Sequence, residues 1–562
     1  MKFTEFPYHR PDVPALLAEY RELSDRVSKA PDGQALLALW EEHEKQDEAY
    51  SQMARLAQIR HTIDTRDAFY NGENDFFDQN SPGVGNAQLA FYRACLASPH
   101  KEALARRYGD ILLTVLDLAV RGADDRVLEL MQEDNSLVSR YQNLYAGALV
   151  DFEGQQLTLP QLGPHKQSLD RDKRRRAFCA EGEWFDAHRE EFDEIYGRMV
   201  TNRNAQARTL GFEDYSQLSY LRMGRIGYGP QKVESYRRQV LRDLVPLVQK
   251  LQGLKFRRVG LTNPKFYDLP VYFRDGNALP HGTPDQLMEG CRKMYRELSP
   301  ETAEFIDFMF DNQLFDLLTK PGKAPGGYME QISGYAPFVF SNWNGTSGDV
   351  DVITHEMGHA FQAYMAQKQG LISELFSPGM ESCEIHSMSM EFLTSPWHHL
   401  FFGPDTAKYQ LAHAEDSVFF LPYGSMVDEF QHLMYRQPHL TPEERNRTWL
   451  ELEHRYRPWI DFDNLPFYGR GAGWQRQLHI YECPFYYIDY CLAQTVALQF
   501  FTAFLHDPKD AWQRYLALVK KGGTESYAGL VQAAGFAVPF EDSSLAPVAR
   551  EVAGWIETHQ QV

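Results

Sequence analysis

Apolar and polar residues alternate along most of this chain with the period of an amphipathic helix. Between residues 13 and 63, apolar side chains recur three or four positions apart with charged residues between them, as at Leu16, Tyr20 and Leu23. Similar segments cover about residues 100–145, 170–210 and 231–255. Gly and Pro residues, which favour turns, separate the segments. The pattern therefore predicts a mainly helical protein.

Two segments show the composition of β-strands instead. Residues 148–160 contain strand-forming residues on both sides of a Glu153-Gly154 turn, which predicts a short hairpin. Residues 328–340 are rich in Ile, Val, Phe and Tyr, and the run ends at Asn344-Gly345. We expect this second segment to form a small antiparallel sheet.

No internal repeat or low-complexity linker divides the chain clearly. We place one modest boundary near residues 180–195. This gives an N-terminal helical lobe over residues 1–190, which carries the short hairpin, and one larger body over residues 191–562, which carries the small sheet and the C-terminal helices.

The composition is that of a folded protein with an acidic surface. Of 562 residues, 43% are hydrophobic and 24% are charged, so compositional disorder is not indicated. The formal net charge is -20, and an acidic surface repels phosphate backbones. Nucleic acid is therefore not expected as a partner, and the excess acid is interpreted mainly as a solvated surface.

The cysteines and the N-terminal segment favour a reducing compartment. Six scattered cysteines without a C-x-x-C pair indicate neither a disulfide framework nor a cysteine metal site. The first residues lack an apolar signal core. The longest apolar stretch, taken as Ile111 to Val120, contains Asp117 and is far shorter than the roughly 20 residues of a membrane span. We expect a cytoplasmic protein without membrane contact.

The most informative motif is His355-Glu356-Met357-Gly358-His359, an H-E-x-x-H match inside a helix expected from about Val350 to Gln367. Positions i and i+4 lie on one face of a helix, so both imidazoles can bind one ion. Glu356 lies one position further round and can contact a metal-bound water without ligating the metal. Zinc suits imidazoles and a carboxylate that leave a fourth position for water.

The competing interpretation is that the two histidines are ordinary residues of a half-buried helix. Val352, Ile353, Ala360, Phe361 and Tyr364 make this helix apolar almost all round, so it is expected to be buried. Unpaired histidines and a glutamate buried there would cost several kcal/mol. A metal ion removes that cost, and the metal site is therefore the favoured interpretation.

A third ligand is expected on a neighbouring helix. Within the segment ESCEIHSMSME, Glu381, Glu384 and Glu391 share one helix face. Spacing alone neither chooses among these carboxylates nor excludes His386. Asp351, one turn before His355, could accept the second ring N–H of a ligand histidine, and a role as a helix-start acid is equally plausible.

The residues from Gly326-Gly327-Tyr328 through Asn342–Asp349, followed by the H-E-x-G-H helix, resemble the oligoendopeptidase F and Pz-peptidase branch of the thimet-oligopeptidase family of zinc metallopeptidases. In that family the third ligand is the first Glu of an E-x-x-S-x-x-x-E pattern. Glu384, Ser387 and Glu391 match this pattern. The resemblance therefore implies one Zn²⁺ ion held by His355, His359 and Glu384, with Glu391 beside the ligands.

The resemblance also implies groups that contact the substrate. The family carries a His and a late Tyr near the substrate carbonyl, and His479 and Tyr490 are the best equivalents in HIYECPFYYIDY. Tyr486 is a second candidate, although core packing is equally plausible for it. A strand before the zinc helix binds the peptide backbone in the family, and Gly327, Gly334 and Tyr335 are expected along that groove.

Taken together, the residues and the resemblance predict a two-lobed helical metallopeptidase with a deep substrate channel and a small antiparallel sheet beside the zinc helix. The expected activity is hydrolysis of internal bonds of oligopeptides, with Glu356 activating the water. A zinc carboxypeptidase or dipeptidase is the alternative, but no sequence feature marks a group that captures a peptide terminus. A non-catalytic peptide- or metal-binding protein would not require Glu356.

Overall fold

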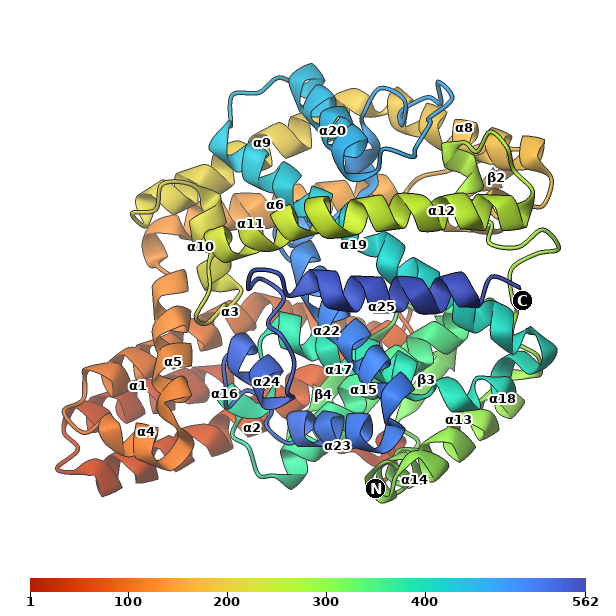
Figure 1. Ribbon diagram of the computed structural model, residues 1–562. Helices are drawn as coiled ribbons and strands as arrows, with labels where there is room; N and C mark the ends of the chain where they lie inside the picture. Colours follow the sequence, from red (N-terminus) through yellow and green to blue (C-terminus); the bar gives the residue numbers. More distant parts are fainter. Residues whose placement is uncertain (562) are drawn as a thin grey trace.

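The computed structural model describes residues 1–561 and is mainly helical, with about 70% of the residues in helices (Figure 1). The expected fold class is therefore confirmed. Helix starts follow from local sequence, since Asp12, Asp32, Asp67 and Asp170 each accept hydrogen bonds from the first backbone N–H groups of their helices.

The first part of the chain contains ten helices and one hairpin. The helices are α1 (Val13–Ser28), α2 (Gly33–Ile63), α3 (Ala68–Ala97), α4 (Glu102–Tyr108), α5 (Asp110–Gly122), α6 (Leu128–Ala146), α7 (Gly163–Lys166), α8 (Arg171–Ala187), α9 (Arg189–Thr209) and α10 (Tyr215–Arg222). The hairpin consists of β1 (Val150–Phe152) and β2 (Gln155–Leu157), as the sequence predicts.

The middle part contains the three-stranded sheet. Its elements are α11 (Pro230–Gln239), α12 (Val245–Val259), α13 (Pro284–Leu298), α14 (Pro300–Asp311), β3 (Phe315–Leu318), β4 (Tyr328–Ile332), β5 (Ala336–Trp343), α15 (Gly348–Lys368), α16 (Ser373–Phe376), α17 (Met380–Leu393) and α18 (His399–Phe402).

The last part is again helical. Its elements are α19 (Thr406–Arg436), α20 (Pro442–Tyr456), α21 (Leu478–Glu482), α22 (Tyr487–His506), α23 (Pro508–Val519), α24 (Tyr527–Ala533) and α25 (Leu545–Thr558). In Figure 1, α6, α8, α9, α11, α12 and α20 lie in the upper half, whereas α13–α17, α23 and the sheet lie in the lower half. Helices α1, α4 and α5 extend to the lower left. The division of the chain at residue 190 stays a prediction.

The sheet beside α15 is mixed rather than antiparallel. Its strand order is β3-β5-β4, and β4 pairs with β5 as a hairpin, with Tyr328 opposite Phe340 and Ile332 opposite Ala336. Strand β3 pairs with β5 in parallel, so the expectation of a purely antiparallel sheet was wrong. The chain leaves β3, forms β4 at the opposite edge and returns through the centre as β5. Strand β4 is therefore an edge strand.

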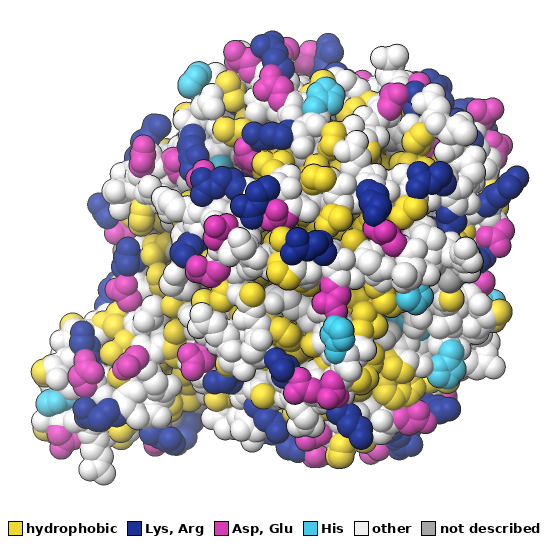
Figure 2. Space-filling view, viewed as in Figure 1, with side chains coloured by type: hydrophobic (Ala, Val, Ile, Leu, Met, Phe, Trp, Pro, Cys, Tyr) yellow, Lys and Arg dark blue, Asp and Glu magenta, His cyan; other side chains and the backbone are white. Residues whose placement is uncertain are grey.

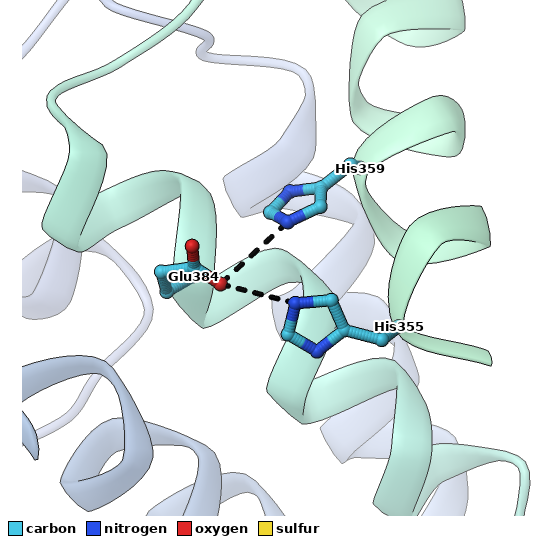
Figure 3. A group of neighbouring side chains, drawn as sticks. All are labelled: His355, His359 and Glu384. Carbon is cyan, nitrogen blue, oxygen red and sulfur yellow. Dashed lines mark ion pairs between the residues drawn. The ribbon is translucent and has the colours of Figure 1, made fainter. Parts of the chain in front are cut away.

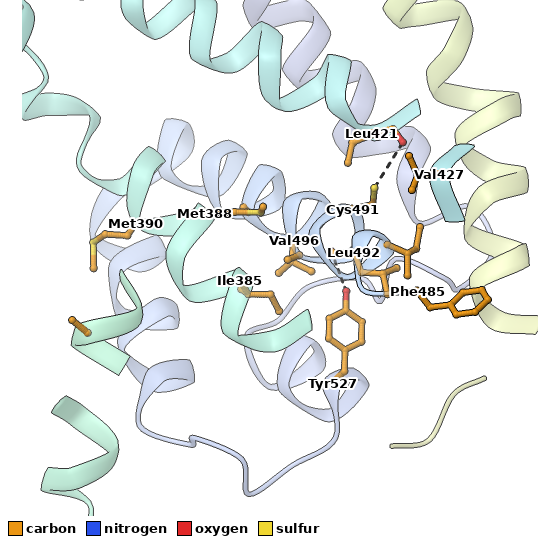
Figure 4. Packing of buried hydrophobic residues seen from close by; sticks show 14 of the residues in the cluster. Ile385, Met388, Met390, Leu421, Val427, Phe485, Cys491, Leu492, Val496 and Tyr527 are labelled. Atoms are coloured by element: carbon orange, nitrogen blue, oxygen red, sulfur yellow. Dashed lines mark hydrogen bonds between the residues drawn. The ribbon is translucent and has the colours of Figure 1, made fainter. Parts of the chain in front are cut away.

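The core is built around α17, which packs between α15 and α22. Figure 4 shows Ile385 and Met388 of α17 facing Leu492 and Val496 of α22, while Cys491 lies near Leu421 of α19. These residues are 9% exposed or less. Burial of such side chains stabilises the fold by about 1.5–3 kcal/mol each.

Helix α22 corrects one sequence interpretation. It is longer and more apolar than the stretch around Ile111 to Val120, and it is the one helix of the described chain long and apolar enough to cross a membrane. However, 78% of that segment is buried inside the protein, and α22 contacts α17, α19, α23 and α25. Its composition is explained by its place in the core.

Charged side chains of both signs cover the surface. Figure 2 shows Lys and Arg interspersed with Asp and Glu over one face of the protein. On that face the acidic excess is not gathered into one patch, in agreement with a solvated surface.

The approach of α15 to α17 requires a glycine. A Cβ atom at Gly358 would lie 2.7 Å from the carbonyl oxygen of His386 and 2.7 Å from Cα of Ser387. Both atoms belong to the backbone of α17, so neither can move aside without displacing the helix. The sequence motif and the helix packing are thus connected at this residue.

Gly358→Ala is expected to lower the free energy of unfolding by about 1–3 kcal/mol, because overpacking forces α15 and α17 apart. Thermal and denaturant unfolding would measure this loss. Gly554→Ala on α25 is the control, since no atom lies within 4 Å of its added Cβ and Ala favours a helix over Gly by about 1 kcal/mol. Equal stability of Gly358→Ala and the unmodified protein would contradict the packing argument.

Candidate metal centre

The structure brings His355, His359 and Glu384 together. Oε2 of Glu384 lies 3.2 Å from Nε2 of His355 and 3.6 Å from Nε2 of His359 (Figure 3). Both histidines project from α15 one turn apart, and Glu384 projects towards them from α17. The glutamate is buried, and the two histidines are partly exposed.

The spacing of these three atoms fits a small tetrahedral ion. Ligand bonds of about 2.0–2.1 Å at tetrahedral angles place neighbouring donor atoms about 3.4 Å apart. The two distances from Glu384, 3.2 and 3.6 Å, lie on either side of that value. Two imidazoles and one carboxylate form a donor set that zinc accepts with a fourth position left open.

Two hydroxyl groups hold the carboxylate of Glu384 in place. The Ser387 hydroxyl donates to Oε2 at 3.0 Å, and the Tyr486 hydroxyl donates to Oε1 at 2.7 Å. Burial raises the pKa of the Glu384 carboxyl, but the charges and hydrogen bonds of His359 and His355 outweigh this effect and hold it well below its ordinary value. Glu384 is therefore ionised, as a metal ligand must be.

Glu391 orients His355 from the other side. Its Oε1 lies 2.8 Å from Nδ1 of His355, and its Oε2 lies 2.6 Å from Nε2 of His413 on α19. Burial raises the pKa of Glu391, but these hydrogen bonds lower it to about 2. An ionised Glu391 that accepts the Nδ1 proton leaves Nε2 of His355 free for a metal.

Asp351 does not make the contact that the sequence suggested. It accepts a hydrogen bond from the Tyr409 hydroxyl at 2.5 Å, and His355 bonds to Glu391 instead. Although Asp351 lies one turn before His355 on the same helix, the side chain of Glu391 reaches the ring nitrogen from α17. Of the two roles left open for Asp351, the contact with a ligand histidine is not formed, and Asp351 lies as an acid in the first turn of α15.

Glu356 is buried beside the three ligand residues. Burial raises its pKa above the ordinary glutamate value, and the charges of His355 and His359 oppose the shift. The nearby backbone N–H of Met329 on β4 also lowers the pKa of its carboxyl, and α15 packs against β4. The edge strand and the candidate general base therefore lie side by side.

His479, Tyr486 and Tyr490 form one aromatic group next to the ligands. The ring centre of His479 lies 5.8 Å from those of both tyrosines, and the two tyrosine rings are 4.8 Å apart. Nδ1 of His479 lies 2.9 Å from Nε2 of Gln477, which suits an acceptor Nδ1 and leaves the proton on Nε2. Burial lowers the pKa of His479, so its imidazole is neutral at pH 7.

Two of the alternatives that the sequence left open, His386 and Glu381, lie apart from the three side chains. His386 is buried, neither of its ring nitrogens has a hydrogen-bond partner among the described residues, and burial lowers its pKa to about 3. Its ring packs against Tyr515. Glu381 is buried beside Arg225 and Tyr228. Burial raises its pKa above the ordinary value, although the charge of Arg225 opposes this shift.

The three expected groove residues are spread along the hairpin. Gly327 precedes β4 and faces α15, where an added Cβ would lie 3.2 Å from Val352. Gly334, at φ 71°, forms the turn between β4 and β5, and a Cβ there would lie 2.4 Å from Glu48. Tyr335 stacks on Phe6 at 4.4 Å. Gly334 and Tyr335 thus contact N-terminal residues instead of lining the free edge of β4.

A cavity of about 840 Å³ adjoins the site. Its lining includes Asp351, Glu391, His413, His479 and Tyr490. Further lining residues come from α12, the loop around Tyr272, α19, the segment around Trp459 and α22. Sequence analysis did not identify His413, Tyr409 or these distant lining residues, because no motif spacing connects them to the H-E-x-x-H helix.

The sequence matches two family profiles. Residues 3–122 match the Peptidase M3 N-terminal domain, and residues 165–549 match Peptidase family M3. Oligopeptidase PepF of Bacillus subtilis (strain 168) is 21% identical over 367 residues, which cover 61% of this chain and 53% of that protein. The match thus spans about half the length of that curated relative.

Two solved structures are similar over their whole length. The structure of Pz peptidase A with inhibitor 2 is 42% identical with a TM-score of 0.94, and both chains are covered completely. A structure described as an oligoendopeptidase F is 43% identical, with the same TM-score and the same complete coverage. The resemblance found in residues 326–391 therefore extends to the complete fold.

Glu391→Gln is expected to weaken metal binding about 10- to 100-fold, because the ligand histidine loses its charged acceptor. Competition with a chelator would measure this. In the metal-free protein, the depressed pKa of Glu391 contributes stability that is present above pH 4.5 and is lost as the pH falls towards 2. The free energy of unfolding should therefore fall less steeply over that range in the variant.

The control is Glu289→Gln, which changes an exposed glutamate on α13. It should leave both the metal affinity and the pH dependence of stability unchanged. Parallel stability curves for Glu391→Gln and the unmodified protein would contradict the assignment of Glu391.

Proposed function

This chain belongs to peptidase family M3, and from that premise we propose that it is a zinc-dependent oligoendopeptidase that hydrolyses internal bonds of short peptides. The supporting observation is the convergence of His355, His359 and Glu384, with donor atoms 3.2 and 3.6 Å apart. These three side chains would hold one Zn²⁺ ion. When bound, zinc supplies a Lewis acid that acidifies a water molecule and polarises a carbonyl group.

Glu356 is the proposed general base. It follows His355 on the same helix and lies beside the ligands without being one of them. Burial raises its pKa, which brings the carboxylate closer to the proton affinity that a base at neutral pH needs. It would remove a proton from the attacking water and pass that proton to the leaving amine.

Tyr490 and His479 are the proposed oxyanion donors. Attack on an amide places negative charge on the carbonyl oxygen, and hydrogen-bond donors fixed in advance stabilise that charge. Both residues line the cavity next to the ligands, and the neutral His479 has an Nε2–H to donate. The Tyr486 hydroxyl already donates to Glu384, which favours a role in orienting that ligand.

The substrate backbone is proposed to lie along the free edge of β4. An edge strand has unpaired backbone groups, and an extended peptide can pair with them whatever its sequence. The packing of β4 against α15 and the proximity of the Met329 backbone N–H to Glu356 support this proposal. Oligopeptides are thus the proposed substrates, and the cytoplasm is the proposed location of the protein.

A carboxypeptidase would need a cation that captures the terminal carboxylate. Lys255 and Arg457 are the Lys and Arg side chains that line the cavity. Arg457 binds Glu453 through two hydrogen bonds, and Lys255 donates to the backbone oxygen of Leu269. Because both are engaged within the protein, the cavity favours internal cleavage.

A quenched fluorescent peptide blocked at both ends tests this proposal. We expect cleavage at an internal bond, loss of cleavage after a chelator is added, and recovery when zinc is restored. Hydrolysis only of peptides with a free terminus would show an exopeptidase instead. Cleavage that a chelator does not affect would remove the metal from the mechanism.

Glu356→Gln should retain one zinc ion per site formed by His355, His359 and Glu384, yet lower kcat by about 10²–10⁴-fold, because the general base is lost. Metal analysis and peptide cleavage would be measured on the same sample. Glu304→Gln, an exposed change on α14, is the control and should retain activity. Substantial turnover in Glu356→Gln would show that another group activates the water.

A further inference from the structure

A second group of metal-ligating side chains lies apart from the catalytic residues. It consists of His43 and Glu44 on α2 and Glu374 on α16. One ligand atom of each residue lies within 4.8 Å of the others. Asp47, one turn after His43 on α2, is half-buried beside them and interacts with both His43 and Glu374. None of these residues carries a role in the proposed hydrolysis.

Each member of this second cluster is held in a defined position. Nε2 of His43 lies 2.9 Å from Oε1 of Glu374, and Nδ1 lies 3.3 Å from the Tyr20 hydroxyl. The Tyr92 hydroxyl donates to Oε1 of Glu374 at 2.6 Å. The rings of Trp40, Phe91 and Tyr92 surround His43, which is fully buried.

The segment before α17 completes the second cluster. The backbone N–H of Ser373 donates to Oε2 of Glu44 at 3.3 Å, and its hydroxyl donates to Oε2 of Glu374 at 3.1 Å. Gln88 donates to Asp47 at 3.2 Å. By contrast, Oε1 of Glu44 is buried and has no hydrogen-bond partner among the described residues.

The second cluster holds more negative than positive charge. Glu44, Asp47 and Glu374 face one imidazole, and no Lys or Arg of the described chain forms an ion pair with any of the three carboxylates. The group therefore needs either a bound proton or a cation, because buried carboxylates at this spacing cannot all be ionised alone.

We propose that His43, Glu44 and Glu374 form a second, structural binding site for a divalent first-row transition ion, Zn²⁺ or Mn²⁺. Nε2 of His43, the orphan Oε1 of Glu44 and Oε1 of Glu374 are the ligand atoms. One imidazole among carboxylates suits these ions, whereas an oxygen-only site would suit calcium. Nδ1–H of His43 then donates to the Tyr20 hydroxyl, which fixes the tautomer and the ring orientation.

This second site would join two parts of the chain. His43 and Glu44 belong to the N-terminal helices, whereas Glu374 lies in the short connection between α15 and α17, the two helices that carry the catalytic ligands. Helix α16 contacts α2 and α5 at this junction (Figure 1). An ion here would tie the N-terminal helices to the connection without taking part in the reaction.

The test is the number of ions bound by the complete chain. Metal-free protein would be mixed with excess Zn²⁺ or, separately, Mn²⁺, and passed through a desalting column. Elemental mass spectrometry would then measure the number of metal ions per chain. We expect two ions per chain for the unmodified protein. Glu384→Gln should keep the ion of the second cluster and bind one, whereas Glu44→Gln should keep the catalytic ion and bind one.

Tyr20→Phe should bind the second ion about 10- to 100-fold more weakly, because it removes only the acceptor for Nδ1–H of His43. Glu42→Gln is the matched control, since it changes an exposed glutamate of the same helix that pairs with Arg26. It should still bind two ions.

A second measurement is the shift in unfolding temperature when a chelator is added. If the second site exists, the chelator should still lower the unfolding temperature of Glu384→Gln. In Glu44→Gln, only the part of the shift that comes from the catalytic ion should remain. One ion in the unmodified protein together with none in Glu384→Gln would overturn the proposal and leave a proton as the occupant. This result uses only the unmodified protein and Glu384→Gln, so it does not depend on whether Glu44→Gln folds. The peptide-cleavage assay tests the proposed hydrolysis separately.

Discussion

The convergence of His355, His359 and Glu384 depends on one close contact between two helices. Gly358 presents no side chain towards α17, so the backbone around His386 and Ser387 packs directly on α15. Glu384 lies two residues before His386 on α17, so this contact brings its carboxylate close to both histidines. The spacing of these three side chains is thus set by backbone packing rather than by side-chain flexibility. Glu391, two turns further along α17, then contacts His355 at its Nδ1 atom.

The parts of the site that lie on one helix could be predicted from the sequence. His355, Glu356 and His359 are related by helix periodicity alone, and the structure brings the histidines together with Glu384. The choice of Glu384 over Glu381 needed the family resemblance, because both carboxylates share a helix face. The two roles left open for Asp351 could not be separated for a related reason, since the contact with His355 comes from Glu391 on another helix.

Other features depend on tertiary structure and had no local signal. His413 reaches Glu391 from α19, and nothing in its neighbours on that helix marks it. The parallel pairing of β3 with β5 depends on the path between strands, which composition does not record. The apolar character of α22 resembles a membrane segment, and only its contacts show that it is a core helix. The helical class was predictable because amphipathic periodicity is local and extends over most of the chain.

The packing of α17 against α22 has a consequence for the order of folding. The two helices are separated by 93 residues of sequence, 394–486, so α17 leaves the ribosome well before its main partner exists. Until then the face that carries Ile385 and Met388 has no apolar cover, and chains at this stage are prone to aggregate. The proposed oxyanion donors, His479 on α21 and Tyr490 on α22, are synthesised at this late stage as well. The enzyme can therefore complete its fold only late in synthesis, when α22 packs against α17, which was made much earlier.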